Sequence, residues 1–413
     1  MKLLLLMGIP CMTLFGLTLE KSIDLSLEHS PLIALHSSDV RYQQILKDEA
    51  TAGYQPTLDA EFGWQKLEKT SDFIFSPTHH SDIYLSYNLF NGFSDYANIR
   101  SKEADVKVSR LLRTSAVSDL KLSVTVAYAN IMKAQKSIQV QTEQLKALSK
   151  QYDDTQNRYE QGVVAKDDLL LIEVEKLKAE QSLIQAKSDL RVTKNILESN
   201  IGLKLPKEEP LYDFNTSISQ IQHMNILEEQ MLSNRSEIKA STYKKESLLR
   251  QRDAANGSFL PKIDTKLMYQ VNDQERSVGS SLIQPKDQTS VNINLSWNLY
   301  NGHRDELKRK SLLEKSFQED YQLNLLKFTL KEQLIRGYEN YVISDSAKKV
   351  AVKALKSAIE NYRITSDKFA YGKIDTLTLL VSQSNLTQAK MALNNAEYDL
   401  YIAYRTIERI VGE

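Results

Sequence analysis

The stretch SWNLYNGHRD, residues 296–305, joins two sequence patterns that have different periods. Ahead of Asn301-Gly302, polar and apolar residues alternate, which is the period of a β-strand. Behind this pair the chain becomes charged and contains no proline, as in a long helix. A near copy, SYNLFNGFSD, occupies residues 86–95. The chain is therefore predicted to run a strand directly into a long helix twice.

The two stretches belong to a duplication of the whole chain. Residues behind the joint recur at a constant offset of 210, and residues ahead of it recur at an offset of 205. The matched positions are Asn91-Gly92 with Asn301-Gly302, Tyr128 with Tyr338, Gly162 with Gly372, Gly202 with Gly412 and, at the shorter offset, Pro56 with Pro261. Because loops tolerate changes of length, about 110 residues without an insertion or deletion predict continuously packed helices. The five extra residues of the second copy are expected between its two strands.

Each copy is predicted to contain one long helix and one shorter returning helix. Between Phe93 and Gln161 there is no Gly or Pro, and apolar residues follow the alternating spacing of three and four that is typical of coiled-coil packing, broken only by Gln141. These residues are Val117, Leu120, Val124, Ala127, Ile131, Ala134, Ile138, Leu145, Leu148 and Tyr152. We expect long helices of about 100 Å at 93–161 and 303–371, and returning helices at 163–201 and 373–411. A further helix is expected ahead of the strands of each copy, at 17–52 and 226–256.

Four segments have the alternation of strands, at about 57–65, 81–90, 262–270 and 290–299. Nine or ten residues is the length with which a tilted strand crosses a bilayer, and a half-buried strand of a soluble sandwich would show the same pattern. If the strands cross a membrane, the polar face that carries Asp59, Glu61, Asn292 and Asn294 would line a pore. Four strands cannot close a membrane barrel, which needs about eight, and lipid does not tolerate an open edge. Closure would therefore require several copies of the chain.

The N-terminal segment differs in composition from the rest of the chain. Residues 1–16 consist of a lysine near the start and then a mostly apolar run that contains the only cysteine, Cys11, which predicts a signal peptide cleaved near Gly16. Elsewhere no stretch approaches ~18 apolar residues, so no transmembrane helix is expected. The remaining chain divides into repeat 1 (17–205), a linker (206–225) and repeat 2 (226–413).

The sequence lacks the features of several other functional classes. The formal net charge is zero and the charged residues are scattered, so nucleic acid is not an expected partner. There is no GxSxG, GxxxxGK[ST] or HExxH motif. We therefore expect neither an enzyme nor a protein with a metal or another cofactor.

Several segments resemble the TolC family of outer-membrane efflux and secretion channels. They are LTLEKSIDLSLEHSPLI (17–33), GYQPTLDAEFGW (53–64), NLFNG (88–92), NLYNG (298–302), RYEQGVVAKDDLL (158–170) and KFAYGKIDTLTLL (368–380). The resemblance implies a mainly α fold with a small β part, in which long antiparallel coiled-coil helices form an α-barrel. It further implies a homotrimer whose four strands per chain form one 12-stranded barrel in the outer membrane, above a helical tunnel across the periplasm.

The function implied by the resemblance is passive conduction. Such a channel is the exit duct of a tripartite efflux pump or a type I secretion system, and it works with a periplasmic adaptor and an inner-membrane transporter. A periplasmic coiled-coil adaptor, or a scaffold protein without a pore, is the alternative.

The two tip turns, where each long helix meets its returning helix, are the candidate gates. Their residues are Gly162, Lys166, Asp167 and Asp168 in repeat 1 and Gly372, Lys373 and Asp375 in repeat 2. Acidic groups repeated by symmetry would form a ring that favours cations. The alternative is that these aspartates are solvated turn residues or helix N-caps. In the family's closed gate, basic residues tie the tips together and acidic residues form a ring; here the second tip has Ile374, Thr378 and Val381 instead.

Overall fold

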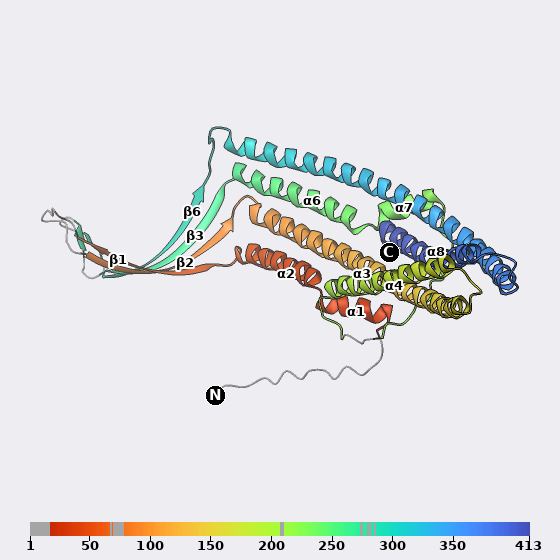
Figure 1. Ribbon diagram of the computed structural model, residues 1–413. Coiled ribbons are helices and arrows are strands. Elements are labelled where there is room, and N and C mark those ends of the chain that lie inside the picture. Colours follow the sequence, from red (N-terminus) through yellow and green to blue (C-terminus); the bar gives the residue numbers. More distant parts are fainter. Residues whose placement is uncertain are drawn as a thin grey trace, which may run out of the picture. The chain divides into compact units, whose positions relative to one another are not determined.

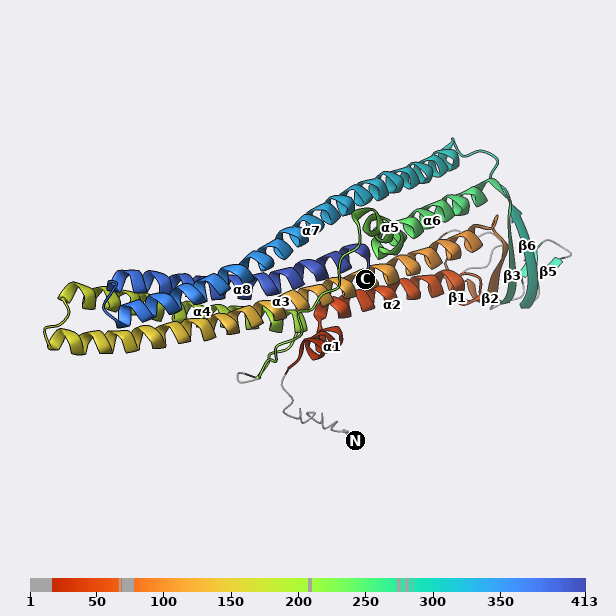
Figure 2. The same cartoon turned by 90° about the vertical axis from the view of Figure 1, so that its right-hand side faces the viewer.

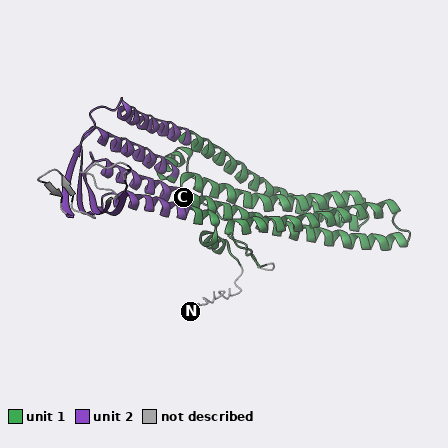
Figure 3. Ribbon diagram, turned by 90° about the vertical axis from the view of Figure 1, so that its left-hand side faces the viewer, with its two compact units in different colours: residues 1–35, 114–236, 327–413 green, residues 36–113, 237–326 purple. Residues whose placement is uncertain are grey.

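The computed structural model describes residues 17–66, 68, 78–206, 210–272, 276–278, 282–284 and 286–413. The predicted signal peptide, with Cys11, lies outside the described residues. The chain divides into two compact units (Figure 3). Unit 1 consists of the residues up to Leu35 together with 114–236 and 327–413, and unit 2 consists of 36–113 and 237–326. Each unit therefore contains parts of both repeats.

The predicted fold class, mainly helical with a small β part, is confirmed (Figures 1 and 2). The helices are α1 (Leu19–His29), α2 (Pro31–Ala52), α3 (Ser94–Glu160), α4 (Lys166–Ile201), α5 (Met224–Asn234), α6 (Ser236–Asn256), α7 (Arg304–Ala370) and α8 (Thr376–Val411), with a short 3-10 turn, η1, at Gly257–Phe259. The duplication is visible in their lengths, since α3 and α7 each have 67 residues and α4 and α8 each have 36. A helix of 67 residues is about 100 Å long.

The helix expected ahead of the strands is broken in both repeats. The first break lies at Ser30, whose backbone has φ −64° and ψ 125°, because Pro31 disfavours the helical conformation of the residue before it. The second lies at Arg235, with φ −57° and ψ 121°, and no proline follows it. There the buried Arg235 guanidinium donates a hydrogen bond of 2.6 Å to the backbone oxygen of Arg409. A tertiary contact thus accompanies the second break.

The core of unit 1 is formed by the predicted heptad positions of α3 together with the segment between the repeats. Leu120, Val124 and Ile131 are buried there. Leu211 and Phe214, from the predicted linker, pack into the same core. The Phe214 ring lies 5.8 Å from the rings of Tyr128 and Tyr398 and 4.9 Å from that of Tyr401. The linker from residue 210 onward is therefore packed against the core of unit 1.

The fully buried hydroxyl of Tyr128 ties the same core to the backbone. It lies 2.7 Å from the carbonyl oxygens of Leu17 and Tyr212, which belong to the start of the described chain and to the linker. Burial raises the pKa of this hydroxyl well above its usual range, since water is excluded from the charged form. The neutral hydroxyl is thereby kept as a hydrogen-bond donor.

Unit 2 holds a four-stranded antiparallel sheet in the order β1-β2-β3-β6, and a separate short hairpin is formed by β4 (Arg276–Val278) and β5 (Leu282–Gln284). The strands are β1 (Thr57–Gln65), β2 (Thr78–Phe90), β3 (Lys262–Asn272) and β6 (Asp287–Ser296). β6 stops at Ser296, three residues earlier than expected. Its last residue is opposite Lys262, the first of β3, and Pro261 before that residue has no N–H to extend the ladder.

Candidate pore and tip surfaces

The sheet has one apolar and one polar face, and the strand register places the expected residues on them. Leu58, Leu85, Leu267 and Val291 lie opposite one another across all four strands. Side chains that are directly opposite in a sheet share a face, and alternate residues point to the other face. The apolar face is open, since side chains on it such as Leu58 (72%), Phe62 (70%) and Ile293 (70%) are largely exposed. A continuous apolar surface of this kind marks contact with lipid or with another protein.

The four predicted pore-facing residues all lie on the opposite, polar face. Asp59 is opposite Tyr84 and Glu61 is opposite Asp82. Asn292 is opposite Lys266, and Asn294 is opposite Asp264. The Lys266 ammonium lies 3.4 Å from the centre of the Tyr84 ring, a cation–π contact between the adjacent strands β3 and β2. This face is therefore suited to contact with water, and the pore-facing role of the four residues stays a prediction.

Each strand-to-helix joint turns on two consecutive left-handed residues. These are Gly92 (φ 70°) with Phe93 (φ 65°), and Gly302 (φ 71°) with His303 (φ 64°). The Ser94 N–H donates to the Asn91 oxygen at 3.4 Å, as in a type I′ turn. Positive φ at Phe93 and His303 was not predicted, and the expected start of the second long helix at His303 moves to Arg304. Such a conformation is rare outside glycine; histidine is enriched in it, but the residue type of Phe93 gives no signal of it.

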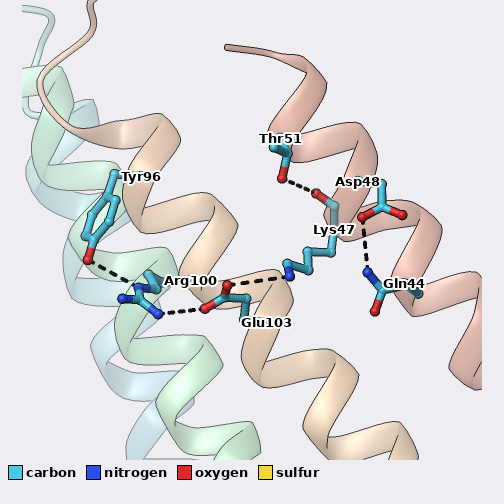
Figure 4. Close-up of polar contacts among 7 residues, drawn as sticks. All are labelled: Gln44, Lys47, Asp48, Thr51, Tyr96, Arg100 and Glu103. Atoms are coloured by element: carbon cyan, nitrogen blue, oxygen red, sulfur yellow. Dashed lines mark hydrogen bonds and ion pairs between the residues drawn. The ribbon is translucent and has the colours of Figure 1, made fainter. Parts of the chain in front are cut away.

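Behind the first joint, polar side chains tie α2 to α3 (Figure 4). The Glu103 carboxylate accepts a hydrogen bond of 2.8 Å from Arg100 and lies 3.6 Å from the Lys47 ammonium. Arg100 also donates to the Tyr96 hydroxyl at 3.2 Å. The hydrogen bond from Arg100 is the main cause that lowers the pKa of Glu103 below its usual range. These contacts connect the two helices that enter and leave the first strand pair.

The two tip turns are built alike, in agreement with the duplication. Gly162 (φ 72°) and Gly372 (φ 67°) each end a long helix in the left-handed conformation. The N–H groups of Gly162 and Val163 donate to the oxygens of Tyr159 and Arg158 at 2.9 Å, and Gly372 and Lys373 repeat this pattern at the same distances. This pair of bonds is the Schellman motif, which favours glycine at the left-handed position. Both turns belong to unit 1 and are exposed.

The acidic tip residues have different structural roles in the two repeats. Asp375 is the N-cap of α8, and its carboxylate accepts a hydrogen bond of 2.9 Å from the Thr378 N–H. Hydrogen bonds from the side chain and backbone of Thr378 lower the pKa of Asp375. In repeat 1 the N-cap is Ala165, without a side-chain bond, and Asp167 and Asp168 lie in the first turn of α4 next to Lys166. The capping alternative therefore describes Asp375, and a cation-selective ring stays a hypothesis.

In the described ranges no helix is both long enough and apolar enough to cross a membrane.

Comparisons with known proteins give one family. The family described as "Outer membrane efflux protein" matches residues 23–203 and 227–413. A search of curated proteins gave no match. Among solved structures, the chain is similar to the outer membrane protein VceC from Vibrio cholerae, with 15% identity and a TM-score of 0.78 over 95% of this chain and 96% of that chain.

Two further solved structures are similar over almost the same length. The open state of the Neisseria gonorrhoeae MtrE outer membrane channel has 15% identity and a TM-score of 0.80, over 95% of this chain and 88% of that chain. The Campylobacter jejuni CmeC outer membrane channel has 14% identity and a TM-score of 0.79, over 95% and 85%. At these identities the likeness concerns the fold.

Proposed function

Because this chain belongs to the outer membrane efflux protein family, we propose that three copies of it form the exit duct of a tripartite efflux pump or a type I secretion system. The protein resides in the outer membrane, and its helices form a tunnel in the periplasm. The duct conducts its cargo passively and performs no chemistry of its own. A periplasmic adaptor and an inner-membrane transporter would deliver the cargo to the tip turns.

The open sheet of unit 2 is the observation that carries this proposal. Its apolar face is exposed, and β1 and β6 form its two edges. In a bilayer every backbone polar group must find a partner, so β6 of one copy would pair with β1 of the next. Three copies would supply twelve strands, with the polar face that carries Asp59, Glu61, Asn292 and Asn294 toward the lumen. The number three rests on the resemblance to the TolC family.

The helices of unit 2 support the same closure. Parts of α2, α3, α6 and α7 lie side by side in this order, so α2 and α7 end the row as β1 and β6 end the sheet (Figures 1 and 2). Large apolar side chains on these two end helices are exposed, among them Ile45 (63%) on α2 and Tyr321 (69%) on α7. Neighbouring copies would cover these side chains when the ring closes.

Fractionation and conductance test the proposal. We expect the protein in the outer-membrane fraction, with a mass in mild detergent of three chains by light scattering, and ion-conducting pores after reconstitution into planar bilayers. A monomer released with the soluble periplasmic proteins would contradict the proposal. That result would favour the adaptor or scaffold alternative, which needs neither lipid contact nor a pore.

A further inference from the structure

The helix row of unit 2 contains three junctions between neighbours. α2 meets α3 where Lys47 and Glu103 approach to 3.6 Å, and α6 meets α7 where Lys245 and Asp320 approach to 2.7 Å. These two junctions are equivalent parts of the two repeats. The third, between α3 and α6, joins one repeat to the other. The free sides of α2 and α7 would form a fourth junction of the same kind only with another copy of the chain.

The repeat offsets relate the junctions residue by residue. Since α2 and α6 are offset by 205 residues and α3 and α7 by 210, positions 40 and 110 correspond to Lys245 and Asp320. Lys47 lies seven residues after position 40 on α2, and Glu103 lies seven residues before position 110 on α3. Because the two helices are antiparallel, both steps lead to the same level of the junction. The α2–α3 and α6–α7 junctions therefore have the same register. The two offsets can thus be used to find, for any contact between two helices, the equivalent pair of residues in the other repeat.

Three polar contacts define the junction between α3 and α6. Asp105 and Lys244 form an ion pair at 3.2 Å. The buried hydroxyl oxygens of Ser101 and Ser247 are 3.0 Å apart. The Ser94 hydroxyl donates a hydrogen bond of 2.7 Å to the backbone oxygen of Ala254. Together they fix the register along about three turns of α3.

The counterparts of these six positions on α7 and α2 are chemically complementary. Asp105 and Lys244 become Lys315 and Asp39, which again have opposite charges but with the signs exchanged. Ser94 and Ala254 become Arg304 and Glu49, a second pair of opposite charges. Ser101 and Ser247 become Ser311 and Tyr42. Arg304, Lys315, Asp39 and Glu49 are all exposed, and within the described part of the chain their side chains form no ion pair.

Apolar positions of the end helices follow the same correspondence. Tyr42 is 56% exposed, whereas its counterpart Ser247 is fully buried against α3. Leu307 on α7 is 61% exposed, whereas its counterpart Ala97 on α3 is 7% exposed. The residues at the internal junction, Ser247 and Ala97, are thus small and buried. Their counterparts on the end helices, Tyr42 and Leu307, are larger, apolar and exposed. An apolar stripe flanked by complementary charges fits a protein partner of matching pattern.

We infer that α7 of one copy packs against α2 of the next copy in the register of the α3–α6 junction. Lys315 then pairs with Asp39 of the partner subunit, and Arg304 pairs with Glu49 of the partner subunit. This inference rests on the proposed function, because only a closed ring of copies brings α7 to α2. It adds the specific contacts that select this register. In the internal pair the acid (Asp105) lies on α3 and the base (Lys244) on α6, whereas between copies the base (Lys315) lies on α7 and the acid (Asp39) on α2. That difference would keep α7 from taking the place of α3 beside α6, where Lys315 would meet Lys244.

Disulfide crosslinking tests the register. In a Cys11→Ser background, Ser311→Cys combined with Tyr42→Cys is expected to give covalent trimers on a non-reducing gel under mild oxidation, because the internal counterparts have oxygens 3.0 Å apart. Gln318→Cys with Tyr42→Cys, shifted by about two helical turns, is the matched control and should not crosslink. Ser101→Cys with Ser247→Cys is the positive control and should form its disulfide within one chain.

Charge exchange tests the ion pairs without any need for a disulfide. Lys315→Asp and Asp39→Lys should each lower the dissociation temperature of the trimer by several degrees, and their combination should restore it, since it recreates the internal polarity. Lys310→Glu, whose side chain is 61% exposed and pairs with Glu306 of its own helix, is the control for unspecific charge effects.

The possible outcomes separate this inference from the proposed function. A trimer by light scattering that crosslinks only at the shifted pair, or in which the double exchange is no better than either single exchange, overturns the inferred register and leaves the channel standing. A monomer in every preparation overturns the channel itself. Crosslinked trimers at the designed pair together with recovery in the double exchange support the inference.

Discussion

The Tyr398 hydroxyl donates a hydrogen bond of 2.7 Å to the Asp213 carboxylate, and this contact fastens the segment between the repeats to α8. The Lys136 ammonium lies 3.1 Å from the other carboxylate oxygen. Burial acts to raise the pKa of Asp213, but the bonds from Tyr398 and Lys136 outweigh it and lower the pKa below its usual range. Burial and the same hydrogen bond raise the pKa of Tyr398. The pair therefore holds Asp213 ionised and Tyr398 neutral around neutral pH.

Replacing Asp213 should give a pH-dependent loss of stability. Because its folded pKa is depressed, its contribution is present above the unfolded value of about 3.9 and is lost as the pH falls through the lower folded value. Asp213→Asn should cost about 1 kcal/mol at pH 7, a modest figure because the side chain is 48% exposed. Melting curves should show the difference from the wild type shrinking below about pH 4. The exposed Asp153→Asn is the control, and a difference independent of pH would contradict the assignment.

Two of the glycines that end helices in unit 1, Gly162 and Gly202, should respond differently to alanine. A Cβ on Gly202 (φ 82°) would lie 2.6 Å from the His29 oxygen, whereas one on Gly162 (φ 72°) would meet nothing within 4 Å. Gly162→Ala should therefore cost only the left-handed conformation, about 1 kcal/mol, and Gly202→Ala clearly more. Melting temperatures of the two variants decide the matter, and equal losses would argue against close packing at Gly202.

Capping and charge at the second tip can be separated by two substitutions of Asp375. Asparagine can accept the Thr378 N–H as aspartate does, but alanine cannot. Asp375→Ala should lower stability by about 1 kcal/mol, while Asp375→Asn should leave the melting temperature nearly unchanged. If Asp375→Ala melts like the wild type, the cap has no energetic role.

Ion selectivity tests whether the acidic tip residues also face the conducting path. Asp168→Asn and Asp375→Asn should each reduce the preference for cations in planar bilayers, because a ring of like charges is removed. The reversal potential in a salt gradient measures this preference. Lys166→Gln, in the same turn as Asp168, is the matched control and should shift the reversal potential in the opposite direction. Unchanged selectivity and conductance in both aspartate variants would reject the acidic ring.

Neighbouring residues of β3 can distinguish the lipid face from the lumen face. Leu267 belongs to the apolar row across the sheet, and Met268 lies on the polar face opposite Tyr84 and Ser290. Leu267→Arg would place a charge toward lipid, at a cost of about 2–4 kcal/mol near the middle of the bilayer, while Met268→Arg would point into water. We expect assembled protein in the outer membrane to fall sharply for the first variant only. Equal yields would contradict the assignment of the faces.

Much of the architecture follows from the sequence because it depends on local rules. The absence of Gly and Pro, the heptad spacing and the repeat offsets predicted helices that the structure places at Ser94–Glu160 and Arg304–Ala370. Alternation predicted the four strands, and the resemblance to the TolC family is confirmed by the family match. These patterns can be recognised in a single sequence because strand alternation, helix-breaking Gly and Pro, and heptad spacing each involve only a few neighbouring residues.

Features that depend on distant contacts were not predicted. Phe214 lies in the predicted linker, yet it packs between rings that are more than 80 residues away on either side. The break at Arg235 accompanies a hydrogen bond to Arg409, 174 residues later. Phe93 takes a left-handed backbone angle that its residue type does not signal. The pore and gate roles of the candidate residues stay predictions, because they depend on the assembled ring.

The alternating register of the sheet also determines which changes of length the gene can accept. Inserting one residue within β3 or β6 would turn every following apolar side chain toward the lumen, whereas inserting two would restore the faces. Between its two strands the second repeat has gained five residues relative to the first, an odd number, but the addition lies between β3 and β6 and leaves Leu267 opposite Val291. Natural variation in length should therefore accumulate between strands in any number, and within them only in pairs.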